Sequence, residues 1–338
     1  MKKNLVSVIV VNYNGKKWLK DCFDALKNQN YKNIQVIMVD NNSVDDSINY
    51  VQINYPNIEI VKSSDNLGFA GGNNLALDIV KGEYVFLLNN DTIIDKDAIG
   101  HLKDKLDSNQ KIGSLQAKLV LMNEPDKMDS CGSFWTSTTF LYHVGSYKDQ
   151  SLDLYNQSFK VFCNKGAAQM IRTELINTLT LFDDDFWAYY EETDFCHRVW
   201  LHGSECWYEP KALVYHANGG TSLNFNSELI QFHNYKNKLM SFIKNFETLN
   251  LLKIIPTYII MSILISFIFI LQGKFKMAMA IYKSYGWNIK NLNKNLKKRK
   301  IIQNMRKVTD KDIFLEVKKE PRWKYYVYLF TGLEKYSD

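Results

Sequence analysis

Short apolar runs alternate with amphipathic segments along the first part of the chain. Four runs are brief and rich in branched or aromatic residues, as buried strands are: 6–11, 34–39, 58–61 and 84–88. Between them, helices are predicted over 16–28 and 45–53 and in a segment that leads to Val80. Strands and helices that alternate at this spacing predict an α/β fold with a mainly parallel sheet and right-handed crossovers.

The pattern is less regular after the fourth strand. A helix over 97–106 and a strand over 112–121 are predicted, whereas 123–160 has no clear period, which indicates loops and short strands. Farther on we predict, in order, an ordered segment over 163–179, a helix from about Glu192, a short strand over 212–215 that ends at His216, and helices past Ser227.

Polar residues follow each of the first four strands. They are Asn12-Tyr13-Asn14, Asp40-Asn41-Asn42, Asp65-Asn66 and Asn89-Asn90-Asp91. Ligands bind at the carboxyl ends of strands in open α/β sheets, so four such ends predict a polar cleft along one sheet edge. A carboxylate beside amides there suits a hard divalent cation that also contacts a phosphate. The alternative for each end is a turn that leads into a helix N-cap.

Two features of this edge suit a nucleotide. Asp40 can accept hydrogen bonds from a ring N–H or a ribose hydroxyl, and Tyr13 can stack on a base. The run from Asn66 to Asn74 contains three glycines, which allow a close approach of backbone to a ligand or a tight entry into a helix. This run is neither GxGxxG nor a P-loop.

A second group of acids lies between 187 and 194, where Glu191, Glu192 and Asp194 stand among aromatic residues. A glutamate beside aromatic rings can serve as a general base, because desolvation raises its pKa toward neutrality. Asp194 and Arg198 are four residues apart on a predicted helix, and a simple ion pair is the alternative for those two. A lone histidine such as His216 is more often a core residue than a metal ligand.

Charge is unevenly distributed along the chain. Residues 1–235 have a net charge of −8 and residues 236–338 a net charge of +14, which sum to the overall +6. A basic tail on an acidic body indicates that the tail faces a polyanion. The five cysteines are scattered without a CxxC pair, and the start of the chain lacks a cleavage site, so we expect free thiols and a cytosolic body.

Six segments in order resemble family 2 inverting glycosyltransferases, and within them the bacterial rhamnosyltransferase-like group. They are SVIVVNYNG, VDNNSVDDS, DNLGFAGGNN, LLNND, YYEETDFCHR and YHANGGTS, and the resemblance covers about residues 4–245. It implies the GT-A fold, a nucleoside-diphosphate sugar donor and a divalent metal, Mg²⁺ or Mn²⁺. Rhamnose is one candidate sugar.

The resemblance also implies roles for individual residues. The metal would be held by Asp91 and His216, and Glu192 would be the catalytic base, with Glu191 and Asp194 beside it. The nucleotide-sugar residues would be Val11, Asn12, Tyr13, Asp40, Asn42, Asn66, Gly68, Asn73, Asn89, Asn90 and Arg198. Two departures matter: the first carboxylate of the family's DxD element is Asn89 here, and its usual Glu-Asp pair is Glu191-Glu192, which leaves the choice of base between two glutamates.

We expect a catalytic domain over 1–245, with a nucleotide-sugar half over about 1–120 and an acceptor half over 121–245. A helical, basic extension follows over 246–338. It contains an 18-residue apolar stretch, 254–271, which is borderline for a membrane span. Beyond it, Ala278, Tyr282, Tyr285, Ile289, Leu292 and Leu296 form one apolar helical stripe among lysines. Aromatic residues typical of interface anchors come last: Trp323, Tyr325, Tyr326, Tyr328 and Phe330.

These features predict an enzyme of cell-surface polysaccharide synthesis, peripheral on the cytoplasmic face of the plasma membrane, which acts on a saccharide or lipid-linked acceptor. A helical layer on the catalytic domain, or a homodimer through these helices, is the alternative for the tail, and we expect no nucleic-acid partner. Two other functions are considered. A sugar nucleotidyltransferase would need an early basic, glycine-rich loop, and a polyanion-binding module would leave the acidic cleft unexplained.

Overall fold

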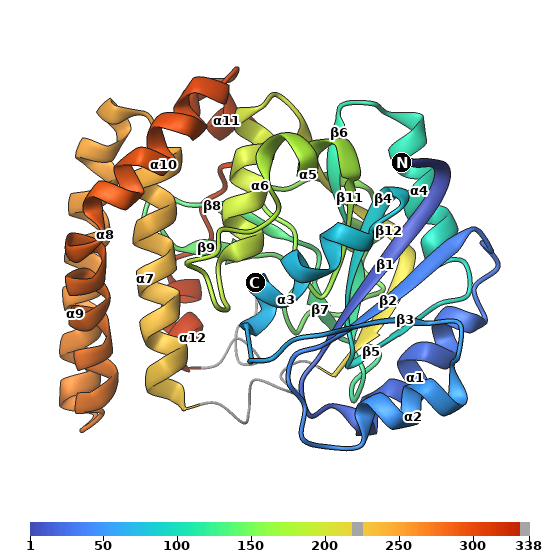
Figure 1. Ribbon diagram of the computed structural model, residues 1–338. Coiled ribbons are helices and arrows are strands. Elements are labelled where there is room, and N and C mark those ends of the chain that lie inside the picture. Colours follow the sequence, from blue (N-terminus) through green and yellow to red (C-terminus); the bar gives the residue numbers. More distant parts are fainter. Residues whose placement is uncertain (218–225, 332–338) are drawn as a thin grey trace.

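The computed structural model describes residues 1–217 and 226–331. A ten-stranded sheet forms the centre of the molecule, as Figure 1 shows. Its strands are β1 (Lys2–Asn12), β2 (Ile34–Asp40), β3 (Glu59–Lys62), β4 (Gly82–Asn89), β5 (Thr92–Ile94), β6 (Ile112–Leu121), β7 (Met128–Ser130), β10 (Phe159–Lys160), β11 (Ala168–Arg172) and β12 (Glu205–His216). A separate two-stranded sheet pairs β8 (Ser133–Trp135) with β9 (Leu141–His143).

The main sheet has the order β10-β12-β6-β11-β4-β1-β2-β3, and β5 and β7 pair with β12 and β6. Neighbours β3, β2, β1 and β4 are parallel, and so are β6 and β12. The strand β11 is antiparallel to both of its neighbours, β4 and β6. The predicted α/β fold with a mainly parallel sheet is confirmed, with antiparallel β5, β7, β10 and β11 as the exceptions that the pattern did not reveal.

Helices cover both faces of the sheet (Figure 1). The helices of this part are α1 (Lys16–Lys27), α2 (Ser47–Asn54), α3 (Gly68–Ala76), α4 (Ala98–Ser108), α5 (Thr173–Leu179) and α6 (Glu191–Leu201), with short 3₁₀ turns at Leu77–Ile79 and Asp153–Asn156. Alternate residues of β1 divide between the faces: Val8 and Val10 pack with α1, α2 and α4, and Ile9 packs with α3, α5 and α6. Burial on both faces is why the first strands read as continuous apolar runs.

The C-terminal part is helical, as predicted. It consists of α7 (Ser227–Asn245), α8 (Thr248–Leu271), α9 (Phe275–Lys290), α10 (Leu292–Met305), α11 (Asp310–Val317) and α12 (Lys324–Thr331). Residues on both sides of the expected boundary at 245 belong to one hydrophobic core, for example Phe242 and Tyr258. The extension is therefore in part a helical layer that packs on the catalytic part, which was the alternative for the tail.

Two details of the tail differ from the sequence reading. The apolar stripe over 278–296 is divided between α9 and α10, and it is not the buried face, because Ile289 is 74% exposed while Ile281 is buried. The predicted anchor Tyr325 is also buried: its hydroxyl donates to the carbonyl oxygen of Leu141 at 3.0 Å. Trp323 is exposed, as an anchor would be, and the side chain of Phe330 lies outside the described part.

An exposed apolar surface covers the outer side of α8 and the start of α9. Within the described residues α8 is the one helix long and apolar enough to cross a membrane by length and composition, and only 22% of its most apolar window is buried. Figure 1 shows α8 and α9 at the side of the molecule opposite β3, α1 and α2. We call this the α8–α9 face; its exposed apolar residues are Ile259, Ile260, Ile263, Leu264, Phe267, Ile268, Ile270, Leu271, Phe275, Met279 and Tyr282.

Candidate active site

The carboxyl ends of three neighbouring strands form one group of polar side chains. In the parallel register Asn12 of β1 stands opposite Asp40 of β2, and Val11 stands opposite Asn89 of β4. The antiparallel pairing of β5 with β12 then brings His216 opposite Thr92, next to Asp91. We call the group at these strand ends, together with Asp91 and His216, the strand-end site. The topology thus brings together residues that are far apart in the sequence.

Asn12 and Asn90 have hydrogen bonds that fix the backbone around this site. The amide of Asn90 donates to Oδ1 of Asn12 at 2.8 Å, and the amide of Asn12 lies 3.2 Å from the hydroxyl of Ser43. A side chain at Gly15 would lie only 2.2 Å from the Asn90 amide nitrogen, which explains a glycine after the first strand end. Both amides therefore position the turns of the site.

Asp40 has one oxygen engaged and one available for a ligand. Its Oδ2 accepts a hydrogen bond from the backbone N–H of Ser43 at 3.1 Å. Its Oδ1 is buried and has no hydrogen-bond partner within residues 1–217 and 226–331. A buried carboxylate oxygen without a donor is costly, and a ligand N–H or O–H would satisfy it. Nearby, Val11 and Tyr13 are half-buried, and Asn42 is exposed with a φ of 65°.

The loop that leads into α3 is held from two sides. Asn41 donates to Oδ1 of Asn66 at 3.0 Å and to the Gly68 carbonyl at 2.9 Å. Gly68 has a φ of 69°, and a Cβ there would lie 2.1 Å from the carbonyl oxygen of Trp187. This glycine accordingly permits close packing of two loops. Asn73 is buried, and its amide donates to the Phe69 carbonyl of its own helix at 2.8 Å.

Asp91 and His216 are buried and close to each other. Nε2 of His216 lies 3.4 Å from Oδ1 of Asp91 and 3.4 Å from the amide nitrogen of Asn89, while Nδ1 lies 2.8 Å from Oδ2 of Asp129. Burial opposes a charge on His216, but the hydrogen bonds to Asp129 and Asp91 outweigh it and raise the pKa of this histidine. The two predicted metal residues are thus adjacent.

A carboxylate and an imidazole nitrogen are donors that Mg²⁺ or Mn²⁺ accepts, so this pair fits a divalent cation. No group of three His, Cys, Asp or Glu side chains that could hold a metal occurs in the described part of the chain. A cation at Asp91 and His216 would therefore need further ligands, such as phosphate oxygens or water. The glycines and Thr221-Ser222 of the last quoted motif lie outside the described residues.

Glu191 and Glu192 begin α6 after a strained turn. Tyr189 and Tyr190 both have a φ of 72°, a conformation that costs about 1–3 kcal/mol per residue and that clusters at functional sites. Asn237 of α7 holds this turn, because its amide donates to the carbonyls of Ala188 and Tyr189 at 2.9 and 2.6 Å. The strain and its support both indicate that the position of the two glutamates matters.

The environment of the two glutamates disfavours their charged forms. Burial raises the pKa of Glu191 well above its ordinary value, with a further contribution from the charge of Glu192. Burial also raises the pKa of Glu192, although backbone N–H groups and Lys165 oppose the shift. In each side chain Oε2 has no hydrogen-bond partner among the described residues. Either glutamate can therefore accept a proton near neutral pH.

Asp194 and Arg198 form the ion pair that their spacing predicts, at 3.0 Å. Asp194 also accepts from Asn245 at 2.9 Å, and the guanidinium of Arg198 donates to the carbonyls of Leu179, Thr180 and Leu181. Because both side chains are buried and engaged with protein groups, we assign them a structural role. They are left out of the site proposed below, which corrects their expected catalytic and nucleotide-binding roles.

Three contributors to the site escape the sequence analysis. Asp129 contacts His216, Asn41 holds the loop before α3, and Lys165 forms an ion pair with Asp129 at 2.7 Å. Asp129 and Lys165 lie in or next to the segment without a clear period, where no pattern indicates which side chains face the site. Asn41 does stand at a strand end, and that signal was available.

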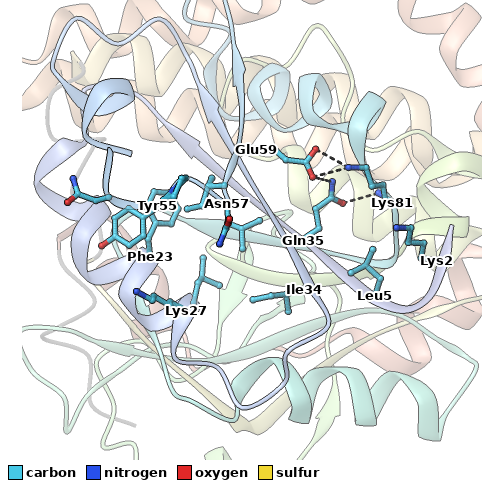
Figure 2. Close-up of a pocket in the computed structure, with 15 residues that line it drawn as sticks. Lys2, Leu5, Phe23, Lys27, Ile34, Gln35, Tyr55, Asn57, Glu59 and Lys81 are labelled. Carbon is cyan, nitrogen blue, oxygen red and sulfur yellow. Dashed lines mark hydrogen bonds and ion pairs between the residues drawn. The ribbon is translucent and has the colours of Figure 1, made fainter. Parts of the chain in front are cut away.

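A cavity of about 480 Å³ lies elsewhere, at the amino ends of β1 and β2 (Figure 2). Its lining includes Leu5, Phe23 and Tyr55, and its polar groups pair with one another. Glu59 forms an ion pair with Lys81 at 3.0 Å and accepts from Gln35 at 2.8 Å. The cavity is therefore at the sheet edge opposite the strand-end site, and we do not assign the catalytic site to it.

Fold and site together define a nucleotide-sugar-dependent class of transferase with the GT-A fold. The family model "Glycosyl transferase family 2" matches residues 7–180, which is just over half of the chain. The chain belongs to this family, and it is a glycosyltransferase.

Three similar proteins illustrate this assignment. Glycosyltransferase GlyG of Streptococcus pneumoniae is 28% identical over 138 residues, 40% of this chain and 44% of the relative. The Escherichia coli protein WfaP, a UDP-Glc:alpha-D-GlcNAc-diphosphoundecaprenol beta-1,3-glucosyltransferase, is 36% identical over 88 residues, 26% of this chain and 35% of the relative. The chain thus matches less than half of the length of each of these relatives.

Among solved structures, the mannosyltransferase PcManGT from Pyrobaculum calidifontis, in complex with GDP-Man and Mn²⁺, superposes with a TM-score of 0.53. It covers 89% of this chain and 83% of its own, at 14% sequence identity. At that identity the likeness shows the fold alone, and it confirms the predicted GT-A architecture.

Proposed function

We propose that this glycosyltransferase moves a sugar from a nucleoside-diphosphate donor to a hydroxyl group of a saccharide or lipid-linked saccharide, with inversion and with a divalent metal. The observation that carries the proposal is the proximity of Asp91 and His216 at the edge where Asp40 has an oxygen without a partner. A metal ligand pair and a nucleoside acceptor on one sheet edge match the two ends of such a donor.

The donor class is supported by the similar proteins. PcManGT is solved with GDP-Man and Mn²⁺, and the E. coli relative is named for UDP-Glc. In this chain Asp40 would accept a hydrogen bond from the nucleoside, with Tyr13 against the base, while Asn89 and the loop at Asn66 would face the diphosphate and sugar. The motifs make rhamnose one candidate sugar.

The reaction needs few groups from the protein. A bound divalent cation would stabilise the charge on the departing diphosphate. Asp91 and His216 would hold that cation, and Glu192 would take the proton from the acceptor hydroxyl as the oxygen attacks the anomeric carbon. A single displacement inverts the anomeric centre and requires no covalent intermediate. The sugar nucleotidyltransferase alternative is not pursued, because the family match supports transfer of sugar.

The donor class can be tested by binding. We expect one of a panel of UDP-, GDP- and dTDP-sugars to raise the unfolding temperature in the presence of Mn²⁺. A donor present at 100 times its Kd would add about 2.7 kcal/mol to the stability. A panel in which no nucleotide-sugar shifts the unfolding temperature, with or without Mn²⁺, would count against the proposed donor class.

The proposed acceptor is carried by the cytoplasmic leaflet of a membrane, and the α8–α9 face would bring the enzyme to it. The E. coli relative is named for a diphosphoundecaprenol-linked acceptor. In this chain the exposed apolar side chains of α8 lie between exposed lysines, Lys253 before them and Lys274, Lys276 and Lys283 after them. Apolar residues bordered by basic ones suit an anionic lipid surface, which attracts each nearby basic residue by about 1 kcal/mol. Under this proposal 1–245 carries catalysis and 246–338 the membrane contact.

Vesicle flotation tests the membrane proposal with the full-length chain. Ile260, Leu264 and Phe267 lie on one side of α8 and are 58%, 52% and 56% exposed. Their joint replacement by asparagine should leave the protein at the bottom of the gradient, whereas the unmodified chain should float with anionic vesicles and float less at high salt.

A control replaces three exposed apolar residues of the catalytic part, Val44, Ile53 and Leu154, by asparagine. This variant should float like the unmodified chain. If the α8 variant floats equally well, the membrane proposal is wrong. If it instead changes a dimer into a monomer without any effect on flotation, the face is an interface between two copies.

A further inference from the structure

We propose that Asp129 is a positioning residue for His216, and that Lys165 holds Asp129 in place between the metal-binding pair and the general base. The inference rests on the proposed function, because it concerns the same metal site. It adds two residues that lie on different elements: Asp129 in β7, and Lys165 in the loop before β11.

Asp129 contacts the ring nitrogen of His216 that faces away from Asp91. Oδ2 of Asp129 lies 2.8 Å from Nδ1, and Nε2 on the other side of the ring lies 3.4 Å from Asp91. The Asp129 side chain is 2% exposed, so this contact is shielded from water. The strand β6 separates the two residues in the sheet, since Leu119 and Val120 pair with β7 on one side and Leu121 pairs with His216 on the other.

This arrangement selects one tautomer of the imidazole. A carboxylate can only accept hydrogen bonds, so Nδ1 must carry the proton and donate to Asp129. Nε2 then presents its lone pair toward Asp91, where a metal would bind. Carboxylate partners of this kind fix ring orientation and raise ligand basicity, and their loss typically weakens metal affinity or activity about 10- to 100-fold.

Lys165 holds Asp129 and is adjacent to the base. Its ammonium lies 2.7 Å from both carboxylate oxygens of Asp129, and its backbone N–H donates to Oε1 of Gln116 at 2.6 Å. The next residue, Gly166, has room for a Cβ only 3.7 Å from the Cβ of Glu192. One short loop therefore contacts both the partner of the metal ligand and the proposed base, so a change at Asp129 should affect metal binding before it affects Glu192.

Mn²⁺ binding, measured by electron paramagnetic resonance on the full-length protein, tests the role of Asp129. Asp129→Ala should weaken Mn²⁺ affinity about 10- to 100-fold. In ¹⁵N-edited spectra of the histidine rings, His216 should lose its single tautomer with the proton on Nδ1. Asp129→Asn keeps the volume, but its amide can either accept from or donate to Nδ1. It should therefore give mixed tautomers and an intermediate affinity, which provides a second readout if the alanine variant does not fold.

Two further variants separate the possible failures. Glu209→Gln removes a buried carboxylate from the same strand as His216, near Lys105, and should leave Mn²⁺ affinity and the His216 tautomer unchanged. His216→Ala should abolish tight Mn²⁺ binding. If His216→Ala binds Mn²⁺ normally, the proposed metal site itself is wrong. If His216→Ala is impaired but Asp129→Ala keeps both the affinity and the tautomer, only the role of Asp129 is overturned.

Discussion

Asp91→Ala is expected to abolish sugar transfer while the protein remains folded. Asp91 is the only carboxylate in the Asn89-Asn90-Asp91 element, so no neighbouring acid of that element can replace it as a metal ligand. Removal of its side chain leaves His216 alone on this side of the proposed cation. The measurement is release of nucleoside diphosphate from the donor, with the unfolding temperature as the check on folding.

Asp78→Ala serves as the control for this variant, since Asp78 is an exposed carboxylate of the same half of the chain and lies outside the strand-end site. It should turn over donor at the normal rate. Full activity of Asp91→Ala in excess EDTA would contradict the assignment of this residue, because neither the metal nor its proposed ligand would then be needed.

Glu192→Gln is expected to lower the rate of transfer by about 10²- to 10⁴-fold, the usual loss when a general base is removed, while donor binding persists. The amide keeps the shape of the side chain but cannot take a proton. Burial raises the pKa of Glu192, so the unmodified enzyme should lose kcat/KM as the pH falls through that raised pKa and the base becomes protonated. Activity should increase with pH across the same range, and Glu192→Gln should lack this dependence.

Glu191→Gln is the matched variant, because the two glutamates are neighbours at the start of α6 and burial raises the pKa of both. If Glu192 is the base, Glu191→Gln should retain more activity than Glu192→Gln. An inactive Glu191→Gln beside a nearly normal Glu192→Gln would transfer the role to Glu191.

The sheet and its polar edge could be predicted from the sequence because they depend on local patterns. The runs before Asn12, Asp40 and Asn89 are buried on both faces, so their apolar character is continuous and their polar ends are distinct. Parallel pairing then places these ends at one edge. The strand β11 was less accessible to prediction, since its antiparallel position between β4 and β6 is set by tertiary pairing.

The partners of individual side chains could not be predicted in the same way. Asp194 and Glu192 lie two residues apart with similar chemistry, yet Asp194 meets Lys244, Arg198 and Asn245, while Oε2 of Glu192 has no hydrogen-bond partner among the described residues. Only the packing of α7 against α6 distinguishes them. Gly68 is similar: its sequence context indicates a ligand loop, and its neighbour in space is the backbone of Trp187.

The tail shows a limit of periodicity as evidence for burial. The stripe over 278–296 has helical spacing, but α9 turns Ile281, Ser284 and Asn288 toward the protein and leaves Ile289 exposed. Asn288 is buried because its amide donates to the carbonyls of Lys236 and Ser284 at 3.1 and 3.0 Å. Polar contacts with α7 thus determine which face of α9 is buried.

Metal-dependent release of nucleoside diphosphate tests the central claim most directly. The full-length enzyme would be mixed with the nucleotide-sugar found in the binding panel, an acceptor and Mn²⁺, and the released nucleotide would be quantified. We predict release that stops with EDTA, returns when Mn²⁺ is restored, and is absent in Asp91→Ala. Release that is unaffected by EDTA and by Asp91→Ala, or production of pyrophosphate from a nucleoside triphosphate in its place, would contradict the proposed site and reaction.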